Sequence, residues 1–81
     1  MHTIQITTQD DLNTAFQIRK AIFVEEQMIP IEYEFDEFDH LESPAKHILV
    51  YWEAQPVGTG RIRWTEGFGK LERVCILSSY R

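Results

Sequence analysis

This 81-residue sequence has little cysteine, proline, glycine and positive charge: one Cys, three Pro, four Gly, and eight Lys and Arg against thirteen Asp and Glu. A single cysteine excludes an internal disulfide framework. The net charge of −5 argues against a broad nucleic-acid surface, because such a surface needs clustered cations. The sequence also shows no basic-then-apolar leader and no apolar run long enough to span a bilayer, so we expect a cytoplasmic protein without a membrane or nucleic-acid partner.

The apolar content is ordinary for a folded domain. Hydrophobic residues make up 43% of the chain and aromatic residues 12%. That is enough for one small domain with one core, since a chain near this size buries about 60 to 65% of its unfolded surface. Cys75 lies inside the apolar run Val74 to Leu77, so we expect an inert buried thiol with no covalent role.

The first part of the chain predicts a strand followed by a helix. Residues His2 to Thr7 alternate apolar and polar side chains, which indicates a half-buried strand. Thr8, three residues before Asp11, is a suitable N-cap. Apolar residues at three-to-four spacing predict an amphipathic helix from Gln9 to Glu25. The stripe consists of Leu12, Ala15, Phe16, Ile22 and Phe23, with Arg19 interrupting it.

An acidic segment follows, from Ile31 to Glu42, and Ser43-Pro44 ends it. Its acids are interleaved with aromatic residues, which favours a loop or a short second helix anchored by its apolar members. The acids, His40 and His47 are metal-capable side chains, but their spacing matches neither a zinc site nor the twelve-residue calcium loop. We therefore predict a solvated acidic segment and no metal.

The remaining residues predict a three-stranded antiparallel meander. The first of these strands is apolar enough to be buried on both faces. In the second, alternation places Arg61 and Arg63 on one face. The strands are predicted at His47 to Glu53, Val57 to Thr65 and Lys70 to Leu77, with turns at Ala54 to Pro56 and between Gly67 and Gly69.

Several short motifs occur in order along the chain. They are Arg-x-x-x-Phe-Val-x-Glu-Gln from Arg19 to Gln27, His-Ile-Leu-Val from His47, Pro-Val-Gly-x-Gly-Arg from Pro56 to Arg61, and Leu-Glu-Arg-Val from Leu71. With these motifs the chain resembles small bacterial proteins of the GNAT superfamily of N-acetyltransferases over all 81 residues. The resemblance implies an α/β (α+β) fold of which this chain is the N-terminal half: a strand, one or two helices, then the three-stranded meander.

The end of the chain resembles the start of the acyl-CoA signature of that superfamily. Ile76, Tyr80 and Arg81 match the hydrophobic strand end and the aromatic-Arg pair before the family's R-x-x-G-x-G/A loop, whose backbone N–H groups bind pyrophosphate at a helix N-terminus. The glycines are missing. Residues 1–81 are therefore interpreted as an incomplete N-acetyltransferase domain that ends at the start of the acetyl-CoA pyrophosphate loop.

The resemblance implies transfer of an acetyl group from acetyl-CoA to an amine, by direct attack in a ternary complex and without a metal. It assigns the main chain of Val74, Cys75 and Ile76 to the pantetheine arm and the thioester carbonyl, as an oxyanion-type contact. It assigns Arg81 to the pyrophosphate.

Glu72 is the candidate general base of the predicted reaction. Period-two geometry would place it on the same strand face as Val74 and Ile76. The alternative for Glu72 is a cross-strand salt bridge with Arg61 or Arg63.

The acceptor pocket is assigned to Arg19, Phe23, Asp36 and Asp39. Arg19 either pairs with Asp36 or Asp39, which we favour, or holds an acidic group of the substrate. The acidic segment suggests a cationic acceptor, a small molecule or a peptide. The same four residues satisfy the Arg-x-x-x-Phe and Asp-x-x-Asp spacing of acyl-homoserine-lactone synthases, a lesser alternative because the tryptophan expected between Phe23 and Asp36 is missing.

A half-sheet that ends in the predicted strand Lys70 to Leu77 would expose an apolar face and an unpaired edge. We therefore expect the isolated chain to be inactive and to associate with the missing C-terminal half of the domain or with a second copy, as a homo-oligomer. The competing function class is a non-catalytic binding or assembly module that uses this fourth-strand edge for β-augmentation.

Overall fold

The computed structural model describes residues 1–81, apart from the side chain of Thr65. The elements occur in the predicted order of strand, helix, short second helix and meander. They are β1 (His2–Gln5), α1 (Gln9–Arg19), the π-helical η1 (Lys20–Glu26), α2 (Ile31–Glu34), β2 (Lys46–Trp52), β3 (Gln55–Thr65), β4 (Phe68–Ile76) and the 3₁₀ turn η2 (Ser78–Tyr80).

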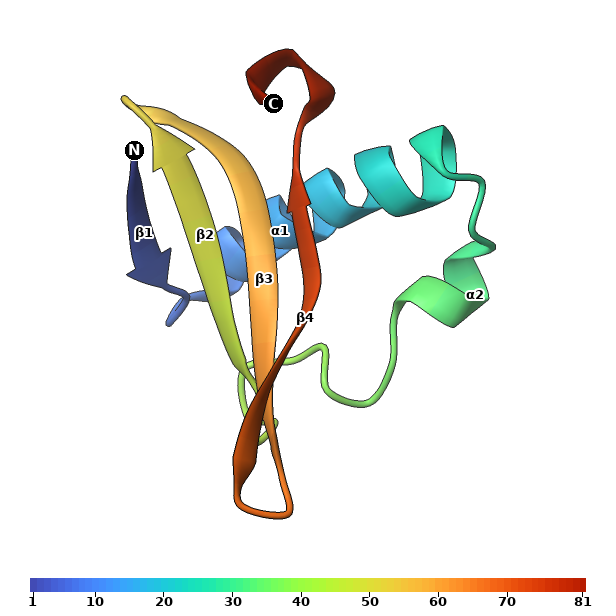
Figure 1. Ribbon diagram of the computed structural model, residues 1–81, viewed down its shortest axis with the longest axis vertical. Helices are drawn as coiled ribbons and strands as arrows, with labels where there is room; N and C mark the ends of the chain where they lie inside the picture. The colour runs from blue at the N-terminus through green and yellow to red at the C-terminus, as the bar shows by residue number, and fades with distance from the viewer.

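Within the described chain, four strands form one sheet in the order β1-β2-β3-β4, and each neighbouring pair is antiparallel. In Figure 1, α1 and η1 run as one rod across one face of this sheet, and α2 lies to the side of the sheet, below the far end of the rod in this view. No described helix covers the opposite face. The chain therefore forms two layers, with β1 and β4 as the edges of the sheet.

The predicted amphipathic stripe forms the core between the rod and the sheet. The helix begins as predicted, because Thr8 Oγ1 accepts a hydrogen bond of 3.2 Å from the Asp11 N–H. Phe16 and Phe23 are only partly buried and pack against the core from its rim. The buried members of the core are Ile6, Leu12, Ala15, Ile18, Ile22, Leu49 and Cys75.

The predicted helix has nearly the right extent but a different winding in its second half. Beyond Arg19 the backbone adopts π-helical hydrogen bonding, as in the 2.8 Å bond from the Gln27 N–H to the Ile22 carbonyl. Such segments are rare and are frequent at functional sites. The apolar spacing did not reveal the change, because Ile22 and Phe23 fit a continued α-helical stripe equally well.

The predicted turn at Ala54 to Pro56 exists but begins one residue earlier, at Glu53 and Ala54. Glu53 takes a φ of +56°, and β3 already begins at Gln55. Pro56 is tolerated inside β3 because it lies opposite Tyr51, where the register between β2 and β3 shifts.

The second turn also differs from the prediction at one of its two glycines. The hairpin turns at Glu66 and Gly67, which both have positive φ, as a two-residue hairpin of type I′ requires. Gly69 lies inside β4, opposite Trp64. A Cβ at Gly69 would come within 3.0 Å of the Trp64 ring, so this glycine leaves space for the indole.

β4 contains a bulge at Arg73 that simple alternation did not anticipate. Glu72 and Cys75, three residues apart, lie opposite β3 residues that are only two apart. Arg73 accommodates the additional residue with a φ of +57°. The prediction that Glu72 shares a strand face with Val74 and Ile76 is therefore wrong, and Glu72 faces the helices together with Cys75.

The open face of the sheet, opposite the helices, is apolar. Ile62, Trp64 and Leu71 share this face, and Trp64 and Leu71 are 66% and 58% exposed. The prediction that β2 is buried on both faces is wrong, since Ile48 and Val50 are only partly buried. Their side of the sheet lacks a second layer in the described chain.

Candidate functional site

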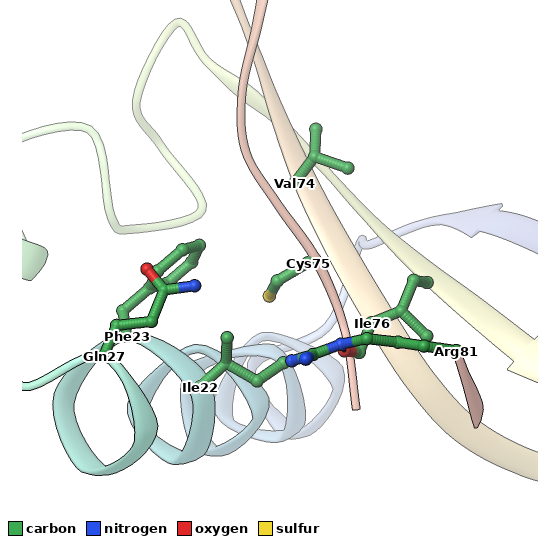
Figure 2. A pocket seen from close by; sticks show the side chains of 7 residues that line it. All are labelled: Ile22, Phe23, Gln27, Val74, Cys75, Ile76 and Arg81. Atoms are coloured by element: carbon green, nitrogen blue, oxygen red, sulfur yellow. Dashed lines mark hydrogen bonds between the residues drawn. The ribbon is translucent and has the colours of Figure 1, made fainter. Parts of the chain in front are cut away.

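A pocket of about 310 Å³ lies between η1 and the end of β4. It brings together the four predicted cofactor residues, from Val74 to Ile76 and Arg81, and one predicted acceptor residue, Phe23. Ile22 and Gln27 complete the wall on the helix side, and Figure 2 shows all seven side chains.

The irregular backbone on both sides shapes this pocket. On the strand side, Cys75 is directed toward the helix, whereas Val74 points away from it (Figure 2). On the helix side, the π-helical turn carries Phe23 and Gln27 to the pocket wall. Because β4 is an edge strand, its outward N–H and C=O groups have no strand partner in the described sheet. The pocket therefore lies beside main-chain groups that can bind a ligand.

Arg81 connects the two sides of the pocket. Its Nε donates to the Ile76 carbonyl at 2.7 Å, and its Nη1 and Nη2 donate to the two carboxylate oxygens of Glu26 at 2.9 and 3.2 Å. Figure 2 shows the side chain extending from the chain end toward the helix. Sequence reasoning missed Glu26 as a partner, because no local spacing relates residues 55 positions apart.

Cys75 is buried, as predicted, although its side chain lines the pocket. Burial raises the pKa of the thiol to about 11. Little thiolate therefore forms near neutral pH.

A network of arginines and carboxylates lies between the acidic segment, the rod and the sheet; we call it the arginine–carboxylate cluster. Among the described residues, every buried side-chain nitrogen and oxygen atom has a hydrogen-bond partner. The cluster is therefore satisfied by the protein itself. Its members are Arg19, Glu34, Asp36, Asp39, Arg61, Arg63, Glu72 and Arg73.

Arg19 forms the structural pair that we favoured. Its Nη1 donates to Asp39 Oδ1 at 2.6 Å, and its Nε donates to Glu34 Oε1 at 3.0 Å. The guanidinium also lies over the Phe35 ring, 4.7 Å from its centroid. The sequence did not identify Glu34 as a partner, and Asp36 pairs with Arg61 instead.

Arg61 is the centre of the cluster and is only 2% exposed. It donates to Asp36 at 2.7 Å, to Asp39 at 3.1 Å and to Glu72. Burial alone would lower its pKa, but the hydrogen bonds that Arg61 donates to Asp36 and Glu72 outweigh burial and raise the pKa. Arg61 therefore stays charged and holds three carboxylates from two parts of the chain.

Glu72, the candidate base, is held by two arginines. Arg63 Nε donates to Glu72 Oε1 at 2.8 Å, and Arg61 Nε donates to the same oxygen at 2.9 Å. Burial raises the pKa of Glu72, but these hydrogen bonds outweigh it and lower the pKa below its usual value. The arrangement matches the salt-bridge alternative for Glu72, and a lowered pKa makes the carboxylate a weaker base.

The predicted acceptor residues separate into two places. Phe23 lines the pocket, whereas Arg19, Asp36 and Asp39 belong to the cluster and are not among the seven described residues of the pocket wall. Asp36 and Asp39 therefore form ion pairs with arginines and do not line the pocket described above.

Stability should fall steeply with acid because of this cluster. Burial raises the pKa of Asp39, but the hydrogen bond from Arg19 and further contacts outweigh burial and lower the pKa. The pKa of Asp36 is lowered in the same way, chiefly by its hydrogen bond with Arg61. A pKa lower in the folded state than in the unfolded state gives stability that is lost as pH falls. His47 acts in the same direction from higher pH, because burial lowers its pKa below 6.5.

We therefore expect the midpoint of thermal unfolding to fall in two stages, from about pH 6.5 for His47 and below about pH 4.5 for the carboxylates. Circular dichroism melts from pH 7 to pH 3 would measure this. In a His47→Gln variant, the fall between pH 7 and pH 5 should disappear and the lower stage should remain. A flat midpoint across the whole range would contradict the prediction.

No group of three or more His, Cys, Asp or Glu side chains in the described residues is arranged to hold a metal ion. Of the helices that the structure describes, none combines the length and the apolar character needed to cross a membrane.

Among the proteins that are similar to this chain over its whole length are two from one bacterium. The chain is 58% identical to a Bacillus subtilis (strain 168) protein named "putative acetyltransferase" and 44% identical to the "uncharacterized N-acetyltransferase YjcF" of the same organism. The chain covers 55% and 56% of these two proteins. No protein-family model matches the chain.

The fold is similar to that of a solved structure. The crystal structure of a "putative N-acetyltransferase" from Lactobacillus plantarum matches 99% of this chain with a TM-score of 0.86 and 27% sequence identity. This confirms the predicted fold class, as the strand, helix and antiparallel meander of an N-acetyltransferase fold. The chain spans about half the length of the proteins it matches.

Proposed function

We propose that this chain, a relative of the GNAT-like N-acetyltransferases over its whole length, forms about half of an enzyme that transfers an acetyl group from acetyl-CoA to an amine. One observation carries the proposal: a single pocket collects Arg81 and the β4 residues Val74 to Ile76. The names of the relatives support acyl transfer in general. Acetyl-CoA as donor and an amine as acceptor are part of our proposal.

The residues of the pocket suit this donor. Ile22, Phe23 and Ile76 supply apolar walls for an acyl group and its thioester arm. The outward edge of β4 offers N–H and C=O groups to the amides of the pantetheine arm, as in the addition of a strand. Arg81 provides a planar fork of donors for a phosphate.

In the proposed reaction, the amine nitrogen attacks the thioester carbonyl carbon, a C–N bond forms, and the C–S bond breaks. The nitrogen then gives up its extra proton, and the departing CoA thiolate takes up a proton to leave as the thiol. A main-chain N–H between Val74 and Ile76 would stabilise the developing oxyanion. Holding the two reactants together would supply much of the rate. A base must first remove a proton from the ammonium group. Glu72 stays a prediction for that role, although its ion pairs reduce its basicity.

The acceptor is proposed to be a small-molecule or peptide amine. Each carboxylate of the cluster binds at least one arginine. These acids are therefore already neutralised by the protein, and they give little reason to require a positive charge on the acceptor besides that of its amine. Phe23 is the predicted acceptor residue that lines the pocket.

The partner of the open face is proposed to be the other half of the same enzyme. The relatives are nearly twice as long as this chain, and the apolar side chains of Trp64 and Leu71 are mostly exposed. A second copy of the chain is the other proposed partner, and in either case we expect the isolated chain to be inactive. The cytoplasmic location stays a prediction.

A non-catalytic assembly module is the second candidate function. The observation that favours it is the edge position of β4, where Val74 is 54% exposed and able to meet another strand. No observation in the described structure specifically favours an acyl-homoserine-lactone synthase, which stays a lesser alternative.

Isothermal titration calorimetry with acetyl-CoA tests the proposed function. Two proteins should be titrated: the 81-residue chain, and a chimera that adds the part of the 58% identical Bacillus subtilis relative that this chain does not match. We expect the chimera to bind and the chain alone to bind more weakly or not at all. An Arg81→Gln chimera should bind more weakly, because a phosphate contact is lost.

If the folded chimera does not bind acetyl-CoA, the enzyme proposal fails. Analytical ultracentrifugation of the 81-residue chain then tests the assembly module, which requires a dimer or larger species. A Val74→Lys variant should disrupt such a species, because a charged residue on an exposed edge opposes strand pairing.

A further inference from the structure

The guanidinium of Arg81 already has an anionic partner in this structure. Its two Nη atoms donate to both oxygens of the Glu26 carboxylate, at 2.9 and 3.2 Å, which is the two-pronged geometry that arginine also uses for a phosphate. Its Nε donates to the Ile76 carbonyl. The fork that would hold an anionic ligand is thus occupied by the protein.

The pair is accessible to a ligand. The side chains of Arg81 and Glu26 are 44% and 42% exposed. Arg81 also lines a second pocket of about 390 Å³, where Trp52 and Tyr80 lie. An anion can therefore approach the guanidinium without unfolding of the core, but it has to replace or share Glu26.

We infer that Glu26 sets the affinity of this site for the phosphate groups of its ligand by competing with them for Arg81. The inference rests on the proposed function and deepens it, since it names a residue of η1 that limits how tightly the donor is held. Glu26 lies at the last residue of η1, so the competition also links the end of the π-helical segment to the end of β4.

The experiment uses the chimera described above, in which the chain is completed by the unmatched part of the Bacillus subtilis relative, and inorganic pyrophosphate as the probe. The Nε–H resonance of Arg81 in ¹⁵N-labelled protein reports the guanidinium directly, at constant ionic strength. We expect Glu26→Gln to tighten pyrophosphate binding about two- to fivefold, the equivalent of breaking one exposed ion pair. Glu25→Gln is the matched control, because it removes the same charge from an exposed neighbour that takes part in none of the ion pairs found among the described residues.

Glu26→Gln and Glu25→Gln with equal affinities would overturn the inference, because only the net charge would then matter. Weaker binding by Glu26→Gln would also overturn it, since Glu26 would then be helping Arg81 to bind the anion. Glu26→Asp, which keeps the charge on a shorter side chain, should fall between the wild type and Glu26→Gln. Thermal unfolding of each variant confirms that it is folded.

The outcome is separable from that of the proposed function. Absence of pyrophosphate binding by the wild type and every variant overturns the role of Glu26, because there is no affinity to set. The proposed function fails on a different result, the absence of acetyl-CoA binding by the chimera.

Discussion

Replacing Arg61 with methionine should lower the free energy of unfolding by about 3–5 kcal/mol, because removing one partner of a buried ion pair leaves uncompensated charge. Here the loss would leave Asp36, Asp39 and Glu72 facing one another. A chain of this length has a total stability of about 4–12 kcal/mol, so the variant should lose a large part of it. Urea denaturation followed by circular dichroism at pH 7 measures the effect.

Lys70→Met is the matched control, because Lys70 also approaches Glu72, at 3.9 Å, but is 63% exposed at its side chain. We expect this change to cost about 0–1 kcal/mol, as is typical of surface ion pairs. The deficit of Arg61→Met should also shrink as the pH falls from 7 to 4, because protonation neutralises the stranded carboxylates. Similar losses for the two variants would show that Arg61 acts as a surface charge.

Gly58→Ala should destabilise the sheet by about 1–3 kcal/mol, because the added methyl group overpacks the contact between β3 and β4. An ideal Cβ at Gly58 would lie 2.3 Å from Ile76 Cδ1 and 2.7 Å from the Cys75 carbonyl oxygen. The Ile76 side chain can rotate away, but the carbonyl belongs to the backbone, so β4 itself must move. The amide resonances of Cys75 and Ile76 should therefore shift, together with the midpoint of urea unfolding.

Gly60→Ala provides the control for this change within the same strand. A Cβ at Gly60 would meet Ile48 at 3.4 Å, which is an ordinary contact. We expect its stability to stay unchanged or to rise by up to about 1 kcal/mol, because alanine restricts the unfolded chain. Equal tolerance of Gly58→Ala and Gly60→Ala would contradict the prediction, because β4 would then have room for a methyl group at Gly58.

Sequence reasoning recovered the order of the elements because that order depends on short-range patterns. The Thr8 cap, the apolar stripe and the alternation along β3 are each readable within a few residues. The bulge at Arg73 was missed because one additional residue in β4 leaves no sign in alternation alone. Because the bulge was not predicted, Glu72 was assigned to the same face of β4 as Val74 and Ile76, whereas it faces the helices.

The site was predictable only in part for a related reason. The resemblance placed Val74 to Ile76 and Arg81 in one site, and the pocket contains them. The pairing of Arg81 with Glu26 depends on tertiary geometry across 55 residues, which no local pattern encodes. The arginine–carboxylate cluster was predicted only in part. Opposite charges suggested that Arg19 pairs with Asp36 or Asp39, but the actual pairs depend on how the acidic segment folds.

The winding of η1 bears on how such proteins diverge. Since its hydrogen bonds span one residue more than those of an α-helix, a one-codon insertion or deletion in this turn would rotate Phe23 and Gln27 relative to the pocket. The preceding turns of α1, which pack on the sheet, would keep their alignment. Ligand preference could therefore drift between lineages through small length changes here, and comparisons that assume a regular helix would match the wrong pocket residues.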